Sequence, residues 1–296
     1  MKLPPFVHVA PSRLGDAVAH LAEAAPQEAL PLAGGQSLVP LMASRARTPR
    51  VLVDLCDLRE LTGVTERDHY LVAGAMTQQH ALATDPRIQG TVPLVAEAAA
   101  YTGHASVRHR GTLGGTLSLA APAAQLLTAA YALDARLLLT GPGGDRECAL
   151  RTWLRGPYTT GLRHGELLTA VALPLRRTGS GHALRQLVHP AGGRPVACVA
   201  AIVDTAPDGT LRRAELTVGT RVSAPSSVDV TARLAEAADS AEATVPADAE
   251  QERGGPPAAY CRRAVRVLAD QALTEAITRA RRPDPRALLI PRWETP

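Results

Sequence analysis

The chain has 296 residues, 46% of them hydrophobic and 20% charged, with a net charge of +4. This composition is typical of a globular protein and excludes a disordered chain, and the length predicts about two domains or subdomains. Aromatic residues make up 3% of the chain and no dense basic block is present, which argues against nucleic-acid binding. No apolar run is long enough for a membrane span and the N-terminus lacks a signal-peptide pattern, so we expect a cytoplasmic protein.

Four cysteines, at positions 56, 148, 198 and 261, are spread along the chain without a CxxC pair. This spacing predicts neither a zinc site nor an iron–sulfur cluster, and so few thiols do not indicate a disulfide framework. The histidines have no carboxylate spacing that is typical of a metal site. We therefore expect no bound metal, and redox chemistry would have to come from an organic cofactor or another chain.

The first half of the chain predicts alternating helices and strands. Residues 12–25 have the apolar spacing of a helix, with Ser12 as its N-cap. β-Branched and apolar runs predict strands at 29–33, 50–55, 69–75, 136–140 and 166–174. Further helices are expected to start near residue 76, over 92–102 and from about residue 122, and GPGGD is expected to be a hairpin turn.

The pattern changes after Pro174, where we expect a polar loop at 176–182. Two strands are expected at 195–205 and 211–219, joined by a PDG turn. An acidic and then Gly/Pro-rich stretch, 239–259, predicts a flexible loop, and apolar spacing predicts a long helix over 260–281.

Two glycine-rich segments carry the functional signal: AGGQSL at 33–38 and RGTLGGTLS at 110–118. Glycine lets the backbone approach a ligand closely, and consecutive peptide N–H groups can hold an anion. The neighbouring hydroxyls of Ser37, Thr112 and Thr116 offer further hydrogen bonds. Neither segment is a GxGxxG or Walker loop. From the residues alone, each segment is either an ordinary turn or part of a site for a phosphate-bearing ligand.

In order and spacing, the two segments resemble the FAD-binding medium subunit of the molybdenum hydroxylases, as in carbon monoxide dehydrogenase and the flavin domain of xanthine dehydrogenase. PLAGGQSLVPLM and VRHRGTLGGTLS resemble the two pyrophosphate loops of that family, and GPYTTGLRHGELLTAVALP and AAYCRRAVRVLADQAL resemble later segments. The resemblance implies an α+β fold of two FAD-binding subdomains (PCMH-type, vanillyl-alcohol-oxidase-like) with a smaller C-terminal α+β domain. The FAD-binding domain would cover 1–175, with subdomains of about 1–58 and 59–175, and the C-terminal domain would cover 176–296.

The resemblance also implies which residues hold FAD. Around the pyrophosphate these are Ala33, Gly34, Gly35, Gln36, Ser37 and Leu38 in the first loop and Thr112, Leu113, Gly114, Gly115 and Thr116 in the second. Thr102 and Leu168 would lie near the adenine or the ring system. Tyr101 and His104 either face the flavin ring or are structural residues.

The chain departs from the family pattern around the flavin ring. Gln125 stands at an acidic position that normally contacts the cofactor, and Gln186 stands at a lysine position. Ala121 replaces a second acid, and Gly193 and Arg194 replace an acid and an aromatic residue. Arg194 therefore either stabilises an anionic reduced flavin or an acidic substrate, or is a solvated loop residue.

Three functions follow from these observations. The first, which the resemblance implies, is an FAD-binding subunit that takes electrons from a 2Fe–2S partner, works with a molybdopterin subunit, and passes electrons to NAD, a quinone or oxygen. The second is a stand-alone FAD-dependent oxidase, dehydrogenase or monooxygenase without partner chains, acting on a small organic molecule. The third is a degenerate, non-catalytic relative.

Overall fold

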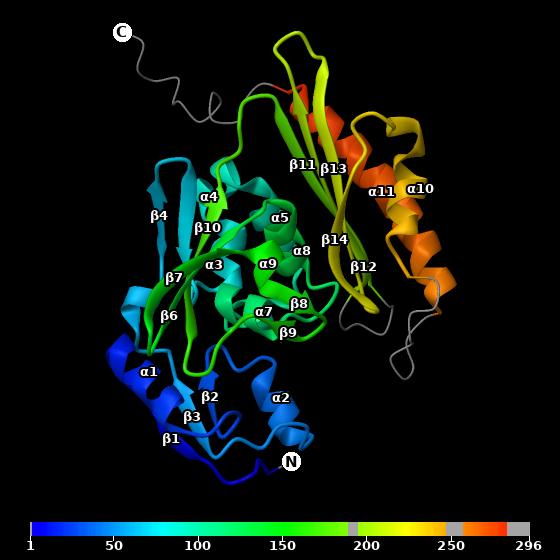
Figure 1. Ribbon diagram of the computed structural model, residues 1–296. Helices are drawn as coiled ribbons and strands as arrows, with labels where there is room; N and C mark the ends of the chain where they lie inside the picture. The colour runs from blue at the N-terminus through cyan, green and yellow to red at the C-terminus, as the bar shows by residue number, and fades with distance from the viewer. Residues whose placement is uncertain (1, 189–194, 247–256, 283–296) are drawn as a thin grey trace, which may run out of the picture. The chain divides into compact units, whose positions relative to one another are not determined.

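The computed structural model describes residues 2–188, 195–246 and 257–282, shown in Figure 1. It combines helices and sheets, which confirms the expected α+β class. Its contacts divide the chain into two compact units, and the chain passes between them several times. Unit 1 comprises Met1–Leu82, Thr102–Ala121 and Asp134–Pro174, and unit 2 comprises Ala83–Tyr101, Pro122–Leu133 and Leu175–Pro296. The domain division at residues 58 and 175 stays a prediction.

Unit 1 begins with a small parallel sheet in the order β1-β3-β2. Its strands are β1 (Val7–Val9), β2 (Ala29–Leu32) and β3 (Val51–Asp54), and the helices α1 (Leu14–Glu23) and α2 (Leu38–Ala43) connect them. Ala17, Val18 and Leu21 of α1 pack with Val53 of β3 in one buried cluster. The prediction of Ser12 as N-cap was wrong, because the cap residue is Arg13 and the Leu14 amide donates instead to Glu60 Oε1 at 2.9 Å.

The second sheet of unit 1 is antiparallel, in the order β4-β5-β10-β6-β7. Its strands are β4 (Val64–Arg67), β5 (Tyr70–Gly74), β6 (Arg136–Gly141), β7 (Gly144–Ala149) and β10 (Leu167–Pro174), preceded by the 3-10 turn η1 (Arg59–Leu61). The predicted hairpin turn is confirmed, because Gly141 pairs with Gly144 across it. The shorter elements are α3 (Gln79–Thr84), α6 (Ala105–Arg108), α7 (Leu113–Leu119), α9 (Leu150–Trp153), β8 (Leu154–Gly156) and β9 (Thr159–Thr160).

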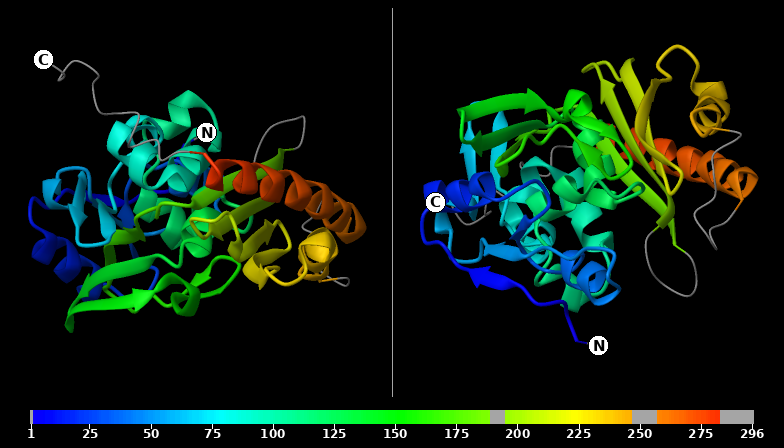
Figure 2. Two further views of the ribbon diagram at one scale, coloured as in Figure 1. Left: turned by 90° about the horizontal axis from the view of Figure 1, so that it is seen from above. Right: turned by 60° about the horizontal axis from the view of Figure 1, so that its bottom comes forward.

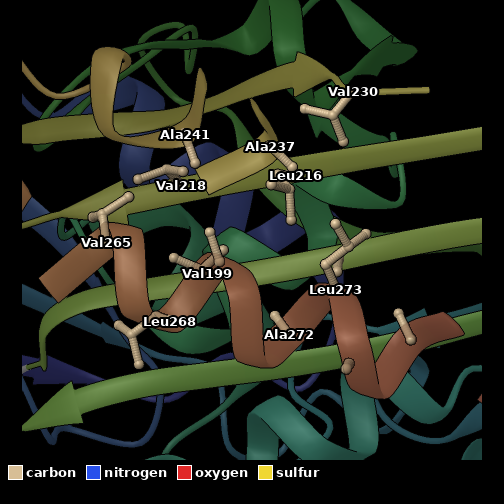
Figure 3. Close-up of a cluster of buried hydrophobic side chains, with 14 of the residues drawn as sticks. Val199, Leu216, Val218, Val230, Ala237, Ala241, Val265, Leu268, Ala272 and Leu273 are labelled. Atoms are coloured by element: carbon tan, nitrogen blue, oxygen red, sulfur yellow. The ribbon is translucent and has the colours of Figure 1, made fainter. Parts of the chain in front are cut away.

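Unit 2 is built on an antiparallel meander of β11 (Ser180–Val188), β12 (Pro195–Thr205), β13 (Leu211–Thr220) and β14 (Ser223–Asp229). The long helix α11 (Ala258–Ala280) lies along one face of this sheet (Figures 1 and 2). Their shared core includes Val199 and Leu216 of the sheet and Leu268 and Leu273 of the helix (Figure 3). The remaining elements are α4 (Pro86–Thr91), α5 (Pro93–Tyr101), α8 (Gln125–Ala132), η2 (Leu234–Glu236) and α10 (Ala237–Ala243).

Two loop predictions in this unit were wrong in part. The expected polar loop at 176–182 already enters β11 at Ser180, where pairing with Asp204 of β12 extends the strand. The expected loop at 239–259 overlaps α10, whose alanines Ala237, Ala238 and Ala241 are buried. In both cases, pairing or packing with distant residues gives structure to a segment whose own pattern is weak.

Candidate functional site

The first glycine loop connects β2 to α2 and leaves its peptide N–H groups unused. Within the described residues, no backbone carbonyl accepts a hydrogen bond from the amides of 34–38. Gly35 has φ +71°, a left-handed conformation that favours glycine. The Gln36 side chain bends back and donates to the Gly34 carbonyl at 3.2 Å. The loop therefore offers a run of neutral donors to an anionic group.

The second glycine loop, by contrast, uses most of its amides to hold itself in place. The Leu113 amide donates to the Thr77 carbonyl at 3.0 Å, and the Gly114 amide donates to the Ala75 carbonyl at 2.7 Å. Thr112 is the N-cap of α7, and its Oγ1 accepts from the Gly115 amide at 3.1 Å. A Cβ on Gly114 would lie 2.5 Å from the Cβ of Ala75, so only glycine allows this approach. The second loop is thus a rigid support.

The two loops touch each other directly through Gly34. A Cβ at this position would lie 1.8 Å from the carbonyl oxygen of Arg110, a distance that no side chain tolerates. Contact between the loops thus requires glycine at position 34. The free amides of the first loop are thereby fixed against the second loop, which is the arrangement that a phosphate-bearing ligand needs.

A polar group that sequence reasoning missed supports the second loop from α3. Gln79 is buried, and its Nε2 donates to Thr116 Oγ1 at 2.9 Å, while Thr116 Oγ1 donates to the Thr112 carbonyl at 3.0 Å. Gln79 Oε1 has no hydrogen-bond partner within the part of the chain that the structure describes. No sequence signal identified Gln79, because its partners come from a distant segment.

Cys56 and Arg110, also missed, lie beside the first loop. The exposed Cys56 follows β3, and its Sγ is 4.0 Å from the Ala33 carbonyl oxygen. Partial burial and the neighbouring Asp54 carboxylate raise the pKa of the Cys56 thiol to about 11, and the positive charge of Arg110 acts in the opposite direction. The sequence offered no spacing that would have linked these three residues.

Gln125 and Gln186, at which the resemblance implies an acid and a lysine in the family, are hydrogen-bonded to each other in unit 2. Gln125 is 6% exposed, and its Nε2 donates to Gln186 Oε1 at 2.8 Å and to the Tyr101 carbonyl at 3.1 Å. The structure thus joins α8, β11 and the end of α5 through a neutral amide pair. The ring of Tyr101 is exposed.

The remaining candidate residues are placed as follows. Thr102 is half-buried, and its carbonyl accepts from Arg108 Nη1 at 3.3 Å. Leu168 is buried on β10. His104 is exposed and precedes α6 without a side-chain capping bond. Arg194 and Gly193 lie outside the described residues, so the structure does not place them.

The described residues contain neither a cluster of metal-ligating side chains nor a membrane-spanning helix. Nowhere in these ranges do three or more His, Cys, Asp or Glu side chains form a group that could hold a metal ion. No described helix combines the length and apolar character needed to cross a membrane.

Comparison with known proteins places these observations in context. Residues 4–176 match the family described as "FAD binding domain in molybdopterin dehydrogenase". The carbon monoxide dehydrogenase medium chain of Afipia carboxidovorans is 37% identical over 198 residues, which are 67% of this chain and 68% of that one. The 6-hydroxypseudooxynicotine dehydrogenase complex subunit alpha of Paenarthrobacter nicotinovorans is 34% identical over 74% of this chain and 73% of its own.

Solved structures agree with these sequence relatives. Reconstituted CO dehydrogenase from Oligotropha carboxidovorans superposes with a TM-score of 0.87 at 32% identity, over 94% of this chain and 100% of that chain. Quinoline 2-oxidoreductase from Pseudomonas putida 86 gives a TM-score of 0.84 at 26% identity, over 95% and 99% of the two chains.

Proposed function

Because the chain belongs to the family of the FAD binding domain in molybdopterin dehydrogenase, we propose that it is the flavoprotein subunit that carries electrons between an iron–sulfur partner and an external acceptor. The chain is an FAD-binding oxidoreductase, as the resemblance of its glycine loops predicts. The observation that carries the proposal is the contact of the two loops at Gly34, which fixes the unused amides of 34–38.

The residues of unit 1 fit the cofactor that this family binds. The pyrophosphate of FAD needs closely spaced donors without steric obstruction, and the first loop supplies them at Gly34, Gly35, Gln36, Ser37 and Leu38, after Ala33. In the second loop, the hydrogen bonds of Thr112 Oγ1 with the Gly115 amide and of Thr116 Oγ1 with the Thr112 carbonyl hold the backbone from Leu113 to Gly115 in place. When bound, the flavin supplies the redox chemistry, and the chain binds and orients it.

Further residues are proposed to contact the cofactor on the strength of the resemblance. Thr102 and Leu168 would lie near the adenine or the ring, and Gln125 and Gln186 would take the positions of the family's acid and lysine. The hydrogen bond between the two glutamines supports a shared role, because one side chain orients the other. We also propose that Tyr101, His104 and Arg194 lie near the flavin ring.

The proposed partners are a 2Fe–2S subunit and a molybdopterin subunit. Relatives named as a medium chain and as a complex subunit support a multi-chain assembly. The proposed location is the cytoplasm, which the four free cysteines support because thiols stay reduced there.

A stand-alone flavoenzyme is the second candidate, and one observation favours it. Gln125 and Gln186 form a neutral hydrogen-bonded pair, whereas the resemblance implies an acid and a lysine at these two positions. A changed charge near a flavin alters how the reduced cofactor is stabilised.

The visible absorption spectrum of the full chain, expressed alone, tests both candidates. We expect a flavin spectrum, and slow reoxidation by air after anaerobic photoreduction, because an electron-transfer subunit awaits its partners. Rapid reoxidation would favour the stand-alone enzyme. A colourless chain that takes up no added FAD would overturn the proposal. Co-expression with candidate iron–sulfur and molybdopterin subunits then tests the partners by co-purification.

A further inference from the structure

Apart from Arg110, which begins the second segment, the glycine loops contain no charged side chain, although the pyrophosphate of FAD carries two negative charges. Residues 33–38 and 111–116 offer only peptide groups, an amide and hydroxyls. Neutral donors hold an anion less strongly than a cationic donor, because a charge-assisted hydrogen bond is about twice as strong as a neutral one. A cation next to the loops would therefore contribute much to binding.

Arg110 is the cation that the fold brings to this place. Its carbonyl group meets Gly34, so its backbone forms part of the contact between the loops. Its side chain is exposed and, within the ranges that the structure describes, forms no hydrogen bond or ion pair. The nearby Arg108 is already engaged, because its Nη1 donates to the carbonyls of Thr102 and Gly103 at 3.3 and 2.8 Å.

Cys56 also lies next to the first glycine loop, at the residue where that loop begins. Its Sγ lies 4.0 Å from the carbonyl oxygen of Ala33, the residue at which the first loop begins. The charge of Arg110 reaches this thiol, since it counteracts the rise in the pKa of Cys56. Of the four free cysteines, Cys56 is exposed, Cys148 is half-buried, and Cys198 and Cys261 are buried.

We propose that Arg110 is a cofactor-binding residue whose guanidinium pairs with the pyrophosphate of FAD at the first loop, and that the bound pyrophosphate covers the thiol of Cys56. This inference rests on the proposed placement of the pyrophosphate at the two loops. It adds Arg110 to the site as a positively charged binding residue. It also makes the reactivity of the Cys56 thiol a measure of whether the site is occupied.

The first experiment measures the alkylation rate of Cys56 by iodoacetamide in the full chain freed of FAD, with mass spectrometry of the labelled peptide. We expect ADP, which contains the pyrophosphate, to slow this reaction at least about tenfold, because it covers the thiol and neutralises Arg110. Riboflavin, which has no phosphate, is expected to leave the rate unchanged. Equal rates with and without ADP would overturn the inference. The variant Cys56→Ser identifies the labelled peptide.

The second experiment compares Arg110→Gln with Arg67→Gln, an exposed arginine on β4 that serves as a charge-matched control. Loss of one charge-assisted contact is expected to weaken FAD and ADP binding by about 10- to 100-fold in Arg110→Gln and not in Arg67→Gln. The variant Arg110→Lys, which keeps the charge, is expected to bind with intermediate affinity.

The outcomes separate this inference from the proposed function. If the wild type binds FAD and Arg110→Gln binds it equally well, the inference is wrong and the proposed function stands. If the wild type binds neither FAD nor ADP, the proposed function fails as well. Should Arg110→Gln not fold, the ADP and riboflavin comparison on the wild type tests the position of the pyrophosphate beside Cys56, and Arg110→Lys tests the role of the guanidinium.

Discussion

At the scale of single residues, Gly34 is the position where the smallest change has the largest predicted effect. In Gly34→Ala the added Cβ would lie 1.8 Å from the Arg110 carbonyl oxygen, so the loops must separate. We expect this variant to lose about 1–3 kcal/mol of unfolding free energy and most of its bound FAD. Thermal unfolding and the flavin-to-protein absorbance ratio measure the two effects.

The matched control is Gly15→Ala in α1, where a Cβ meets nothing within 4 Å. Because alanine favours a helix over glycine by about 0.5–1 kcal/mol, this variant is expected to be slightly more stable than the wild type, with FAD retained. Equal FAD content in Gly34→Ala and Gly15→Ala would contradict the importance of the contact between the loops.

His182 on β11 predicts a pH dependence of stability. It is buried, and its Nδ1 has no hydrogen-bond partner among the residues that the structure describes. Burial lowers its pKa from 6.5 to about 4, against the attraction of Asp204. The unfolded chain therefore takes up a proton at a higher pH than the folded chain. Stability is full above about pH 6.5 and falls as the pH drops towards 4, by a total on the order of 3 kcal/mol from this group.

Urea unfolding at pH 7.5 and pH 5 measures this effect. The variant His182→Leu removes the titratable group, so its stability should fall less between the two pH values than that of the wild type. An equal loss in both proteins would show that other groups cause the acid sensitivity.

At the scale of elements, a cluster of charges ties α5 to β11 and α11 in unit 2. Glu97 of α5 is 15% exposed and accepts from Arg185 Nη1 at 3.2 Å and from Arg279 Nη1 at 2.7 Å. Glu97→Gln removes the charge that both guanidinium groups share and leaves them with Glu275, which lies 2.8 Å from Arg279 and 4.0 Å from Arg185. We expect a loss of about 1.5–3 kcal/mol of unfolding free energy, measured by urea unfolding.

An exposed ion pair provides the comparison for Glu97. Glu28 Oε1 lies 3.7 Å from Arg50 Nε, and both side chains are exposed. Glu28→Gln is therefore expected to change stability by less than about 1 kcal/mol. A similar loss in both variants would mean that burial does not strengthen the cluster at Glu97.

The helices and strands differ in how well the sequence alone predicts them. The strands at 195–205 and 211–219 and the helix at 260–281 were predicted well, because each has a long apolar pattern of its own. β14 was not predicted, because SAPSSVD lacks apolar alternation and is made a strand by its pairing with β13. Elements with a strong local apolar pattern could be predicted from the sequence. Elements that form through pairing with distant segments, such as β14, could not.

The same limit holds for the candidate site. Its glycine loops could be found in the sequence, because glycine pairs with neighbouring hydroxyl residues are a local pattern. The contact of Gly34 with Arg110 and the bond between Gln125 and Gln186 join residues far apart in the chain, so no local signal predicts them. Cys56 and Gln79 were missed for the same reason.

At the scale of the whole molecule, FAD binding should be measurable as added stability. A ligand that binds only the folded chain stabilises it by about 2.7 kcal/mol at a concentration of 100 times its dissociation constant. We expect FAD and, more weakly, ADP to raise the melting temperature of the full chain. Riboflavin should have a smaller effect than FAD, because it lacks the pyrophosphate. An FAD-independent melting temperature in flavin-free protein would contradict binding to the folded chain.

The contact between Gly34 and Arg110 also has a consequence for how the protein is made. During synthesis the first loop leaves the ribosome long before the second, so a nascent chain that ends after β3 holds the donors of the first loop without the backbone that fixes them. Contacts between segments so distant in sequence form late in folding. The site is therefore completed only when the second loop has docked, and loading with the cofactor becomes one of the last steps in the maturation of unit 1.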